Sequence, residues 1–499
     1  MSLPKQNPTQ SFWLNQNPLA NYRTTTELPD NANVVIIGLG LTGTGALLTL
    51  SQKYPHLCIT VLEARDPASG ATGRNGGHLT PSSYRNFRGE SEIFGAKSAY
   101  LKCFLERHNV DQLVKLIHDN SISCDLQEGT GNLQCFFSDI EFAEAKLDLD
   151  AFREADKQFN GNLVEGIEIW EKETVTERLG RSDVYGAILI PAHQLWPAKL
   201  CWSIQQECFK NQNINIQSHT PATNITHLKH LNKWQVRTSR GIITCDVVLH
   251  ASNAWSGRLL PDQISKVLIP TRAQVLAFKS PQDDNVNIKE WTKGFSLHNG
   301  SEYMVRRRKD GTYIVGGGRS NIPGQQMYED DDSQLNEAVG EALRNIMQGH
   351  FPDLLPQYEE AYQEWTGIMC FTLDGAPVIG EVPGVPGQYV AVGYNGHGMP
   401  FAFQSGAFIA EQAASYINGS KIMHNVEMEK RDLIAEAWKQ YDAKRYQIYA
   451  SSHKQAASNV QLYTGLNSRF YDRLKTRKHW VVLTLLIMLI IQFAYCWCR

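Results

Sequence analysis

The chain has 499 residues, of which 42% are hydrophobic and 20% are charged, and its formal net charge is -3. The composition is typical of a globular protein, the length predicts two domains, and the charge shows no basic excess that would suggest nucleic acid as a partner. The ten cysteines form no CxxC pair and no cluster with the spacing of a zinc site. They indicate reduced, buried thiols in a protein that faces the cytosol.

The first 30 residues are predicted to form an irregular arm that lies over the globular part. They are polar and rich in Asn, Pro and Thr. They lack the basic start and the apolar stretch of a signal peptide. We therefore treat residues 1–30 as a separate N-terminal segment.

A dinucleotide-binding motif begins at residue 34. Residues 34–37 form a short apolar run, which is typical of a parallel strand buried on both faces. Gly38, Gly40 and Gly43 follow with the spacing G-x-G-x-x-G, and an apolar helix continues from them. The first glycine permits a tight turn, the second lets the backbone approach a pyrophosphate, and the third lets the helix pack closely on the strand.

An acidic residue at the end of the next strand completes this motif. Residues 57–62 form a second apolar run and Glu63 follows it. Glu63 stands at about the separation, roughly 20 residues past the glycines, from which a carboxylate holds a ribose hydroxyl. Strand, glycines, helix, strand and acid in this order predict a dinucleotide site; the alternative is a glycine-rich turn without a ligand.

The segments that follow alternate between loops, helices and strands. Residues 64–79 contain four glycines, a density that marks a backbone in close contact with something bulky. Apolar periodicity predicts helices at 92–120, 139–159, 195–210 and 335–347. Residues 246–249 read as a second strand of the parallel type. The runs at 275–278, 303–305 and 313–315 alternate more strictly and favour an antiparallel sheet in a separate domain.

A second glycine cluster lies near the end of the globular part. Residues 389–393 read as a strand, residues 401–417 read as a helix, and between them stand Gly396, His397, Gly398 and Met399. Glycines between a strand and a helix N-terminus are suited to hold an anion or the polar edge of a ring.

The C-terminal segment is apolar. Residues 481–497 contain no charged side chain, and Trp480 and Trp497 stand at the two ends of this run. That length is close to the minimum of about 17 residues for a membrane-spanning helix, and basic residues precede it. The pattern predicts a tail anchor at 480–498, with the catalytic part facing the cytosol and residues 431–479 as a charged helical connector. The alternative is a buried core helix.

In their order along the chain, these features resemble the FAD-dependent amine and amino-acid oxidoreductases, the family of D-amino-acid oxidase, glycine oxidase and sarcosine oxidase. The resemblance covers about residues 34–417. It rests on the dinucleotide motif, the loop 69–77, the strand 246–249 with Ala251 and Trp255, the segment 365–380, and the cluster 393–399. The loop 69–77 is similar to the flavin-side loop of bacterial gamma-glutamylputrescine oxidase-like members.

The resemblance implies FAD as the cofactor, and it implies a flavin that carries the hydride chemistry without a catalytic side chain. The glycine motif would hold the pyrophosphate, Glu63 the adenosine ribose, and Ala222 the adenine through its backbone. Thr72 to His78 would line the flavin, and Gly396 to Met399 would close over its pyrimidine side. The expected cofactor-binding residues are Gly38, Gly40, Leu41, Thr42, Gly43, Glu63, Ala64, Thr72, Gly73, Arg74, Asn75, Gly76, Gly77, His78, Ala222, Ala251, Trp255, Asp374, Gly396, His397, Gly398 and Met399.

The chain also departs from the family pattern. Gly367 stands where sarcosine oxidase has the cysteine that bonds its flavin, and Arg74 stands where other members carry a linking histidine, so the expected FAD is non-covalent. Met369 occupies the position of the arginine that binds the substrate carboxylate in D-amino-acid and glycine oxidases, and it cannot make a bidentate pair. The run Arg306 to Arg308 is a candidate replacement; the alternative is a solvated edge.

The resulting expectation is a two-domain α/β protein: a Rossmann-like FAD-binding domain and an α+β substrate domain, followed by the transmembrane helix. The FAD-binding pieces are expected at about 31–100, 190–270 and 365–425, and the substrate domain at about 101–189 and 271–364, within residues 31–430. The expected activity is oxidation of a C–N bond in an amine or amino-acid-like substrate, with molecular oxygen as acceptor; the alternative is another electron acceptor at the membrane, which would make the protein a dehydrogenase. The alternatives are a nicotinamide-dependent dehydrogenase and a membrane-tethered nucleotide-binding scaffold without turnover.

Overall fold

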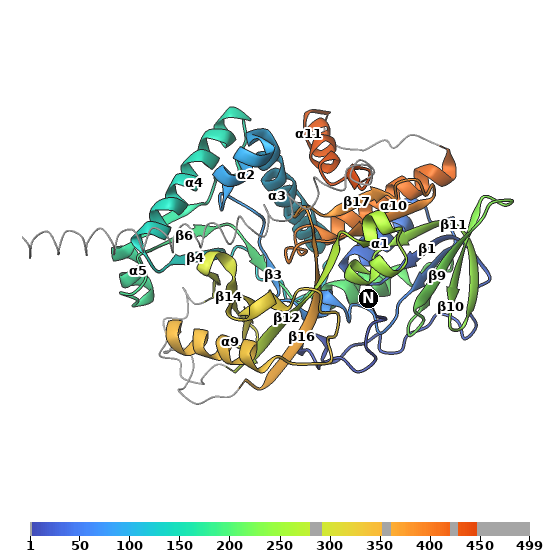
Figure 1. Ribbon diagram of the computed structural model, residues 1–499, viewed down its shortest axis with the longest axis horizontal. Helices are drawn as coiled ribbons and strands as arrows, with labels where there is room; N and C mark the ends of the chain where they lie inside the picture. Colours follow the sequence, from blue (N-terminus) through green and yellow to red (C-terminus); the bar gives the residue numbers. More distant parts are fainter. Residues whose placement is uncertain (1, 280–291, 352–360, 420–427, 447–499) are drawn as a thin grey trace, which may run out of the picture.

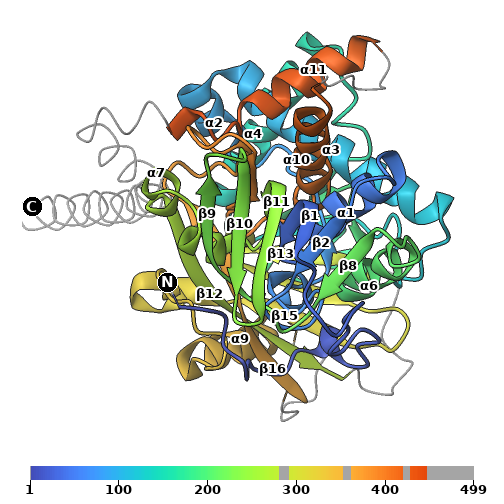
Figure 2. The same ribbon diagram turned by 90° about the vertical axis from the view of Figure 1, so that its right-hand side faces the viewer.

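The apolar run before the glycine motif forms β1 (Asn31–Ile37), an inner strand of an eight-stranded sheet. The computed structural model describes residues 2–279, 292–351, 361–419 and 428–446. The sheet runs in the order β17-β18-β11-β1-β2-β8, and β10 and β9 extend from β11 (Figure 2). Its other strands are β2 (Ile59–Leu62), β8 (Ile214–Gln217), β9 (Ala222–Leu228), β10 (Lys233–Thr238), β11 (Gly241–His250), β17 (Val378–Glu381) and β18 (Gln388–Val392).

The strand register of this sheet gathers three chain segments at one edge. β1 pairs in parallel with both β2 and β11, so Ile37 lies beside Leu62 and His250. The residues that follow these strand ends, Gly38, Glu63 and Ala251, therefore meet at the carboxyl edge of the sheet. This edge is where parallel α/β sheets bind their ligands.

Glycines allow two helices to pack with their backbones almost in contact. These helices are α1 (Leu41–Lys53) and α10 (Ala402–Asn418), which lie together over the parallel sheet in Figure 1. A Cβ at Gly45 would overlap the carbonyl oxygen of Phe403, and one at Gly406 would overlap that of Thr42. This close packing brings the glycine cluster before α10 next to the glycine motif before α1, although the two are far apart in the sequence. A third helix, α6 (Pro197–Cys208), also packs on α1.

The second sheet is mainly antiparallel and has the order β16-β12-β15-β14-β13-β4-β6-β5. β12 and β16 pair over ten residues and pass beside the parallel sheet, whereas the other strands lie farther from it (Figure 1). The strands are β4 (Asn132–Phe136), β5 (Glu168–Glu171), β6 (Gly186–Ile190), β12 (Leu268–Phe278), β13 (Gly294–Leu297), β14 (Glu302–Arg306), β15 (Tyr313–Gly317) and β16 (Gln363–Thr372).

The remaining helices pack on the second sheet and around the region where the two sheets meet. The predicted helix at 92–120 is two helices, because Gly95 adopts a φ of +84° and breaks the run. A residue with a side chain rarely takes this conformation. The helices are α2 (Phe87–Phe94), α3 (Ala96–Asp119), α4 (Asp139–Gln158), α5 (Lys172–Leu179), α7 (Asp262–Ser265), α9 (Glu337–His350) and α11 (Met428–Lys439). A two-stranded ribbon joins β3 (His78–Leu79) to β7 (His193–Gln194).

The N-terminal arm is anchored in the core through one short helix, η1 (Phe12–Leu14). Trp13 is 1% exposed, and its backbone carbonyl accepts a hydrogen bond of 2.7 Å from the indole of Trp196. Phe12 stacks on Trp196 at 5.1 Å. At the other end of the described chain, Ile379 of β17 exchanges backbone hydrogen bonds with Tyr441 and Ala443. Residues on both sides of the segments that are expected to bind FAD therefore pack on the globular part.

The fold class needs one correction. The α/β architecture is confirmed, but within the described ranges no helix combines the length and the apolar composition that spanning a membrane requires. The longest described helix, α3, has 24 residues but carries charged side chains along its length, and the apolar α10 has 17 residues and packs on α1. The helix predicted at 480–498 lies outside the described residues. The transmembrane helix is therefore removed from the fold class, and the membrane localisation and membrane partner that depended on it are withdrawn.

Candidate active site

A cavity of about 460 Å³ begins at the carboxyl edge of the parallel sheet and extends to the antiparallel sheet. Its first part is lined by the segments after β1, β2 and β11. Its second part is lined by β12, β16 and the residues around β14 and β15. The first part has the features of a dinucleotide cradle, and we call the second part the chamber.

Backbone alone forms the centre of the cradle. Gly38 has a φ of +99°, and a Cβ there would lie 2.7 Å from the carbonyl oxygen of Ala251. A Cβ at Gly40 would lie 2.7 Å from Oγ1 of Thr72. Gly40 also provides no side chain to cap α1, so the positive end of the helix dipole faces the cavity. This arrangement suits the pyrophosphate of a dinucleotide.

Glu63 is held rigidly at the wall of the cradle. Its Oε2 accepts a hydrogen bond of 2.8 Å from the backbone N–H of Leu39, and its Oε1 accepts one of 2.9 Å from that of Arg65. Burial raises the pKa of Glu63, although these backbone N–H groups act to lower it. Each oxygen keeps a further lone pair, so the carboxyl group can also accept from the hydroxyls of a ribose.

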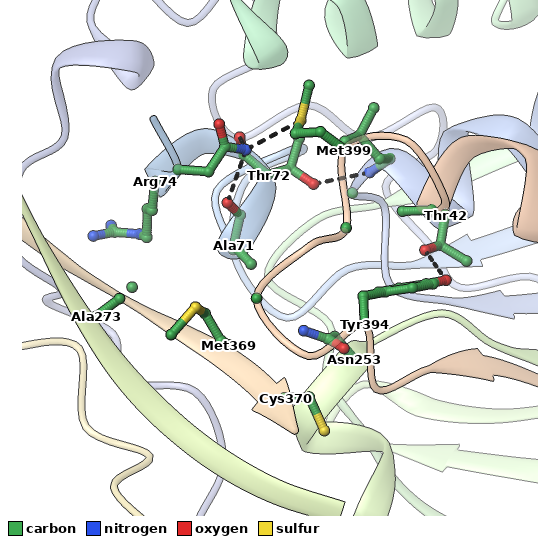
Figure 3. A pocket seen from close by; sticks show the side chains of 18 of the residues that line it. Thr42, Ala71, Thr72, Arg74, Asn253, Ala273, Met369, Cys370, Tyr394 and Met399 are labelled. Atoms are coloured by element: carbon green, nitrogen blue, oxygen red, sulfur yellow. Dashed lines mark hydrogen bonds between the residues drawn. The ribbon is translucent and has the colours of Figure 1, made fainter. Parts of the chain in front are cut away.

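The flavin-side loop (residues 69–77) and the second glycine cluster (Gly396 to Met399, called the late glycine cluster below) lie against each other. Asn75 donates a hydrogen bond of 2.9 Å to the carbonyl of Thr72 and lies 3.4 Å from Sδ of Met399. The hydroxyl groups of Tyr394, before α10, and Thr42, in α1, form a hydrogen bond of 2.8 Å (Figure 3). The two loops that sequence analysis assigned to a flavin therefore border one space. In Figure 3, Met369 projects from β16 into this space, on the side opposite Thr72.

Arg74 is a structural cation. Its Nε donates to Ser69 at 2.8 Å, and its Nη1 donates to the carbonyls of Thr9 and Thr366, both at 2.8 Å. Burial lowers its pKa to about 10, and the carboxylate of Asp332, 3.8 Å from Nε, opposes this effect. Arg74 borders the cavity, but its guanidinium group fixes the flavin-side loop to the arm and to β16.

Glu106 of α3 orients His397 of the late glycine cluster. The distance from Nε2 of His397 to Oε2 of Glu106 is 2.7 Å, and Glu106 is fully buried. Ser82 donates to this carboxylate from its backbone N–H at 2.6 Å and from its hydroxyl at 2.8 Å. Burial acts to raise the pKa of Glu106, but His397 and the other donors lower it overall. A carboxylate in this position selects the ring orientation and the tautomer of the imidazole.

The chamber combines apolar walls with a few polar groups. His78 meets Tyr303 edge to face at 5.1 Å, and burial lowers the pKa of His78 to about 3, with a smaller contribution from His397. His78 is therefore neutral. Met369 and Phe371 form part of the apolar wall.

Three buried polar atoms on the cavity wall have no hydrogen-bond partner among the described residues. They are Nε2 of His78, Oγ1 of Thr80 and Nε1 of Trp255. Buried polar groups in native proteins are nearly always paired, so these atoms point to a polar ligand. A cradle formed by glycines, the Glu63 carboxyl group in its wall and three unpaired polar atoms together fit FAD.

Most of the expected cofactor-binding residues line the cavity. Four do not. Gly43 packs under Gly38, Gly73 packs on Leu14, Gly77 packs on Trp13, and Asp374 pairs with Arg445 at 2.8 Å. The residues that line it are Gly38, Gly40, Leu41, Thr42, Glu63, Ala64, Thr72, Arg74, Asn75, Gly76, His78, Ala222, Ala251, Trp255, Gly396, His397, Gly398 and Met399.

Sequence reasoning missed several chamber residues. Tyr303, Arg85 and Arg319 line the chamber, and Glu106 lies behind His397. None of them belongs to a motif. The arginine run 306–308 that was considered for the substrate does not line the cavity. Arg307 instead is buried, pairs with Asp125 at 3.2 Å and lies over aromatic rings of the arm.

The comparisons with known proteins agree with this geometry. The profile of the DAO family, described as FAD dependent oxidoreductase, matches residues 33–412. Gamma-glutamylputrescine oxidoreductase of Escherichia coli K12 is 23% identical over 384 residues, which is 76% of this chain and 83% of that protein.

Solved structures share the fold. Iminodiacetate oxidase of Chelativorans sp. BNC1 superposes with a TM-score of 0.61 at 15% identity and covers 80% of this chain and 98% of its own. L-proline dehydrogenase of P. horikoshii superposes with a TM-score of 0.60 at 18% identity, and the match covers 84% of this chain and 99% of that protein. FAD, the cofactor that the resemblance implied, is thus confirmed, and the nicotinamide alternative is wrong. The chain belongs to the DAO family of FAD-dependent oxidoreductases.

Proposed function

We propose that this protein oxidises a C–N bond of an amine or amino acid, with molecular oxygen as the electron acceptor. The observation that carries the proposal is the continuity of the cavity, which joins an FAD cradle to a chamber with apolar walls and a neutral histidine. When bound, FAD would accept a hydride from the carbon next to the nitrogen. The resulting imine would hydrolyse to a carbonyl compound.

The residues of the chain would position both reactants. Gly38, Gly40 and the start of α1 would hold the pyrophosphate, and Glu63 would hold the ribose. The loop from Thr72 to His78 and the cluster from Gly396 to Met399 would enclose the ring system, and backbone N–H groups of the cluster would face its pyrimidine edge. The apolar chamber would exclude water from the reacting carbon.

The FAD is proposed to be non-covalent. Gly367 cannot form a bond to a flavin, and a Cβ there would lie 2.8 Å from Arg74. Cys370 lines the cavity but is 1% exposed, and burial raises its pKa to about 12. A thiol that stays protonated is a poor nucleophile.

The names of the relatives support C–N chemistry. Iminodiacetate oxidase and L-proline dehydrogenase are named for substrates in which nitrogen is bonded to the oxidised carbon. Gamma-glutamylputrescine oxidoreductase is named for a substrate that carries an amine. The relatives are named oxidase, dehydrogenase and oxidoreductase, so the proposed oxygen acceptor needs its own measurement.

The test uses the purified full chain. We expect a yellow protein whose visible flavin absorption disappears when amines or amino acids are added without oxygen, and hydrogen peroxide formation when air is admitted. A panel of both substrate classes is needed. A flavoprotein that no member of the panel bleaches would contradict the proposal and would favour a scaffold without turnover; bleaching without peroxide would indicate a dehydrogenase.

Two glycine variants provide a matched pair for the cradle. Gly40→Val should be isolated without FAD, because its side chain would meet Thr72 and fill the space of the pyrophosphate. Gly349→Ala, in α9, is the control, since a Cβ at this exposed position meets nothing within 4 Å. Equal FAD content in the two variants would refute the assignment of the cradle.

A further inference from the structure

The N-terminal arm forms part of the wall of the cavity. Leu3 and Pro4 line the cavity together with the residues of the cradle. The carbonyl group of Lys5, the next residue, accepts a hydrogen bond of 3.3 Å from Nη1 of Arg65. Arg65 also lines the cavity, and it stands two positions after Glu63, the residue expected to hold the ribose. The start of the arm therefore borders the end of the cradle where the adenosine of FAD is expected.

Residues 9–13, the anchored section of the arm, are fixed behind the flavin-side loop. The hydroxyl of Ser11 donates a hydrogen bond of 2.6 Å to the carbonyl of Gly73, and the indole N–H of Trp13 donates one of 2.5 Å to the carbonyl of Asn75. Ser11 is 0% exposed and Trp13 is 1% exposed. Because these contacts are buried and the indole fills a core position, this section stays in place as long as the protein is folded.

Residues 2–5, the first section of the arm, are held by contacts at the surface. The backbone N–H of Ser2 donates a hydrogen bond of 2.6 Å to Oδ2 of Asp330, and this contact is exposed. Nζ of Lys5 lies 3.5 Å from Oδ2 of Asp331, and the side chain of Lys5 is 42% exposed. Exposed polar contacts of this kind contribute little to stability. The first section can therefore separate from the globular part while the anchored section stays bound.

The segment that receives the first section also holds the cradle. Asp332, the neighbour of Asp331, is 0% exposed, and its carboxylate lies 2.9 Å from Nη1 of Arg65. The backbone carbonyl of Asp332 accepts a hydrogen bond of 2.8 Å from the N–H of Thr9. Residues 330–332 thus bind the arm and the cradle at the same place, and this determines where the first section lies when it is bound.

We propose that residues 2–5 are part of the FAD site and that they separate from residues 330–332 when FAD enters or leaves. Their ligand is the adenosine half of the cofactor, against which the apolar side chains of Leu3 and Pro4 would pack. The first section of the arm then sets the rate at which FAD dissociates. This inference rests on the cradle assigned above, but it does not depend on the proposed C–N oxidation and is tested without turnover.

The first test measures FAD release from the holoenzyme as the increase in flavin fluorescence after dilution. Removal of residues 2–7 should raise the release rate about tenfold, because a change of affinity at one interface appears mainly in the dissociation rate. Leu3→Ser should raise it roughly threefold, because it removes part of the apolar contact. Leu231→Ser is the matched control: Leu231 is 53% exposed and does not line the cavity, so FAD release should equal that of the wild type.

The second test cross-links the first section as it lies in the structure. Ser2→Cys and Asp330→Cys are combined in a background of Cys58→Ser, Cys496→Ser and Cys498→Ser, which removes the exposed cysteine and the two near the C-terminus. The oxidised holoenzyme should release FAD about tenfold more slowly than the same protein after reduction, and the oxidised FAD-free protein should take up FAD more slowly by a similar factor. Ser2→Cys alone should show no difference between the oxidised and the reduced form.

Two results would overturn the inference. They are an FAD release rate that is unchanged by removal of residues 2–7, and equal FAD release and uptake in the two forms of the cysteine pair when mass spectrometry confirms the disulfide. If removal of residues 2–7 also lowers the urea midpoint of the FAD-free protein, the cross-linked chain, which keeps the whole arm, decides. FAD retained by Gly40→Val would refute the cradle and with it this inference, whereas loss of FAD from Gly40→Val together with unchanged release after removal of residues 2–7 would refute the role of the arm alone.

Discussion

Asp332→Asn removes the carboxylate that two buried guanidinium groups share. Asp332 is 0% exposed, and Arg65 and Arg74 are 5% and 3% exposed. Nη1 of Arg65 donates to both oxygens of Asp332, at 2.9 and 3.1 Å, and Nε of Arg74 lies 3.8 Å from the nearer one. Asparagine keeps the shape of the side chain but removes the carboxylate that lies within ion-pair distance of both cations. The variant therefore isolates the electrostatic contribution of the site.

The expected loss of stability is large compared with the stability of a typical domain. Breaking a buried ion pair by removing one partner costs about 3–5 kcal/mol, because the remaining charge is left uncompensated. Two cations lose their partner here, although carbonyl groups of Ser69 and Thr366 still accept from Arg74. We therefore expect a decrease of about 4 kcal/mol in the free energy of unfolding, out of a typical total of about 5–15 kcal/mol.

Urea unfolding, followed by tryptophan fluorescence in the presence of excess FAD, measures this loss. Asp262→Asn is the control, because Asp262 pairs with Lys266 one helical turn away and its side chain is 84% exposed. The loss of this ion pair should lower the free energy of unfolding by less than about 0.5 kcal/mol. A decrease below about 1 kcal/mol for Asp332→Asn would refute the reasoning. The FAD dissociation constant should rise in parallel, because Arg74 fixes the flavin-side loop.

Three other changes test separate parts of the structure. Gly43→Ala places a Cβ onto the backbone carbonyl of Gly38, so it should destabilise the fold by about 3 kcal/mol or prevent folding, as judged by the urea midpoint. Ser11→Ala removes a 2.6 Å hydrogen bond to the carbonyl of Gly73 and should weaken FAD binding about tenfold in a fluorescence titration; unchanged affinity would contradict a role for the arm. Burial acts to raise the pKa of Asp125, but its ion pairs with Lys199, Arg307 and Lys309 lower this pKa to about 2. The contribution of Asp125 to stability is therefore complete above its unfolded pKa of 3.8 and is lost as the pH falls towards 2. Asp125→Asn should make the free energy of unfolding depend less on pH in this acid range.

Local patterns in the sequence were sufficient to predict the cradle. Gly38, Gly40 and Glu63 lie within one strand–helix–strand unit, and the geometry of such a unit depends on residues close together in the chain. This unit predicted a dinucleotide site in an α/β protein, and the resemblance of the segments in their order along the chain predicted the family and FAD, which the comparisons confirm. The transmembrane helix was predicted from the apolar composition of residues 481–497 alone; this part of the fold class is corrected, because no helix in the described part of the chain is long and apolar enough to span a membrane.

The orientation of side chains was decided by tertiary contacts. Arg74 stands in the flavin-side loop, as predicted, but Asp332 and Thr9 hold its guanidinium group away from the chamber. Glu106 and His397 are 291 residues apart and meet because α3 packs beside the late glycine cluster. Neither contact follows from periodicity or from a motif.

The order of residues along the chain thus determines the cradle proposed for FAD, and the folding of the chain determines which side chains line the adjoining chamber. The glycine motif works through backbone atoms, whose positions follow from the strand and the helix on either side of it. The chamber is lined by side chains such as Tyr303, which lies on β14 of the other sheet, and Arg319, which follows β15 of that sheet. Their distances to one another depend on how two sheets pack, and that packing is a property of the whole fold.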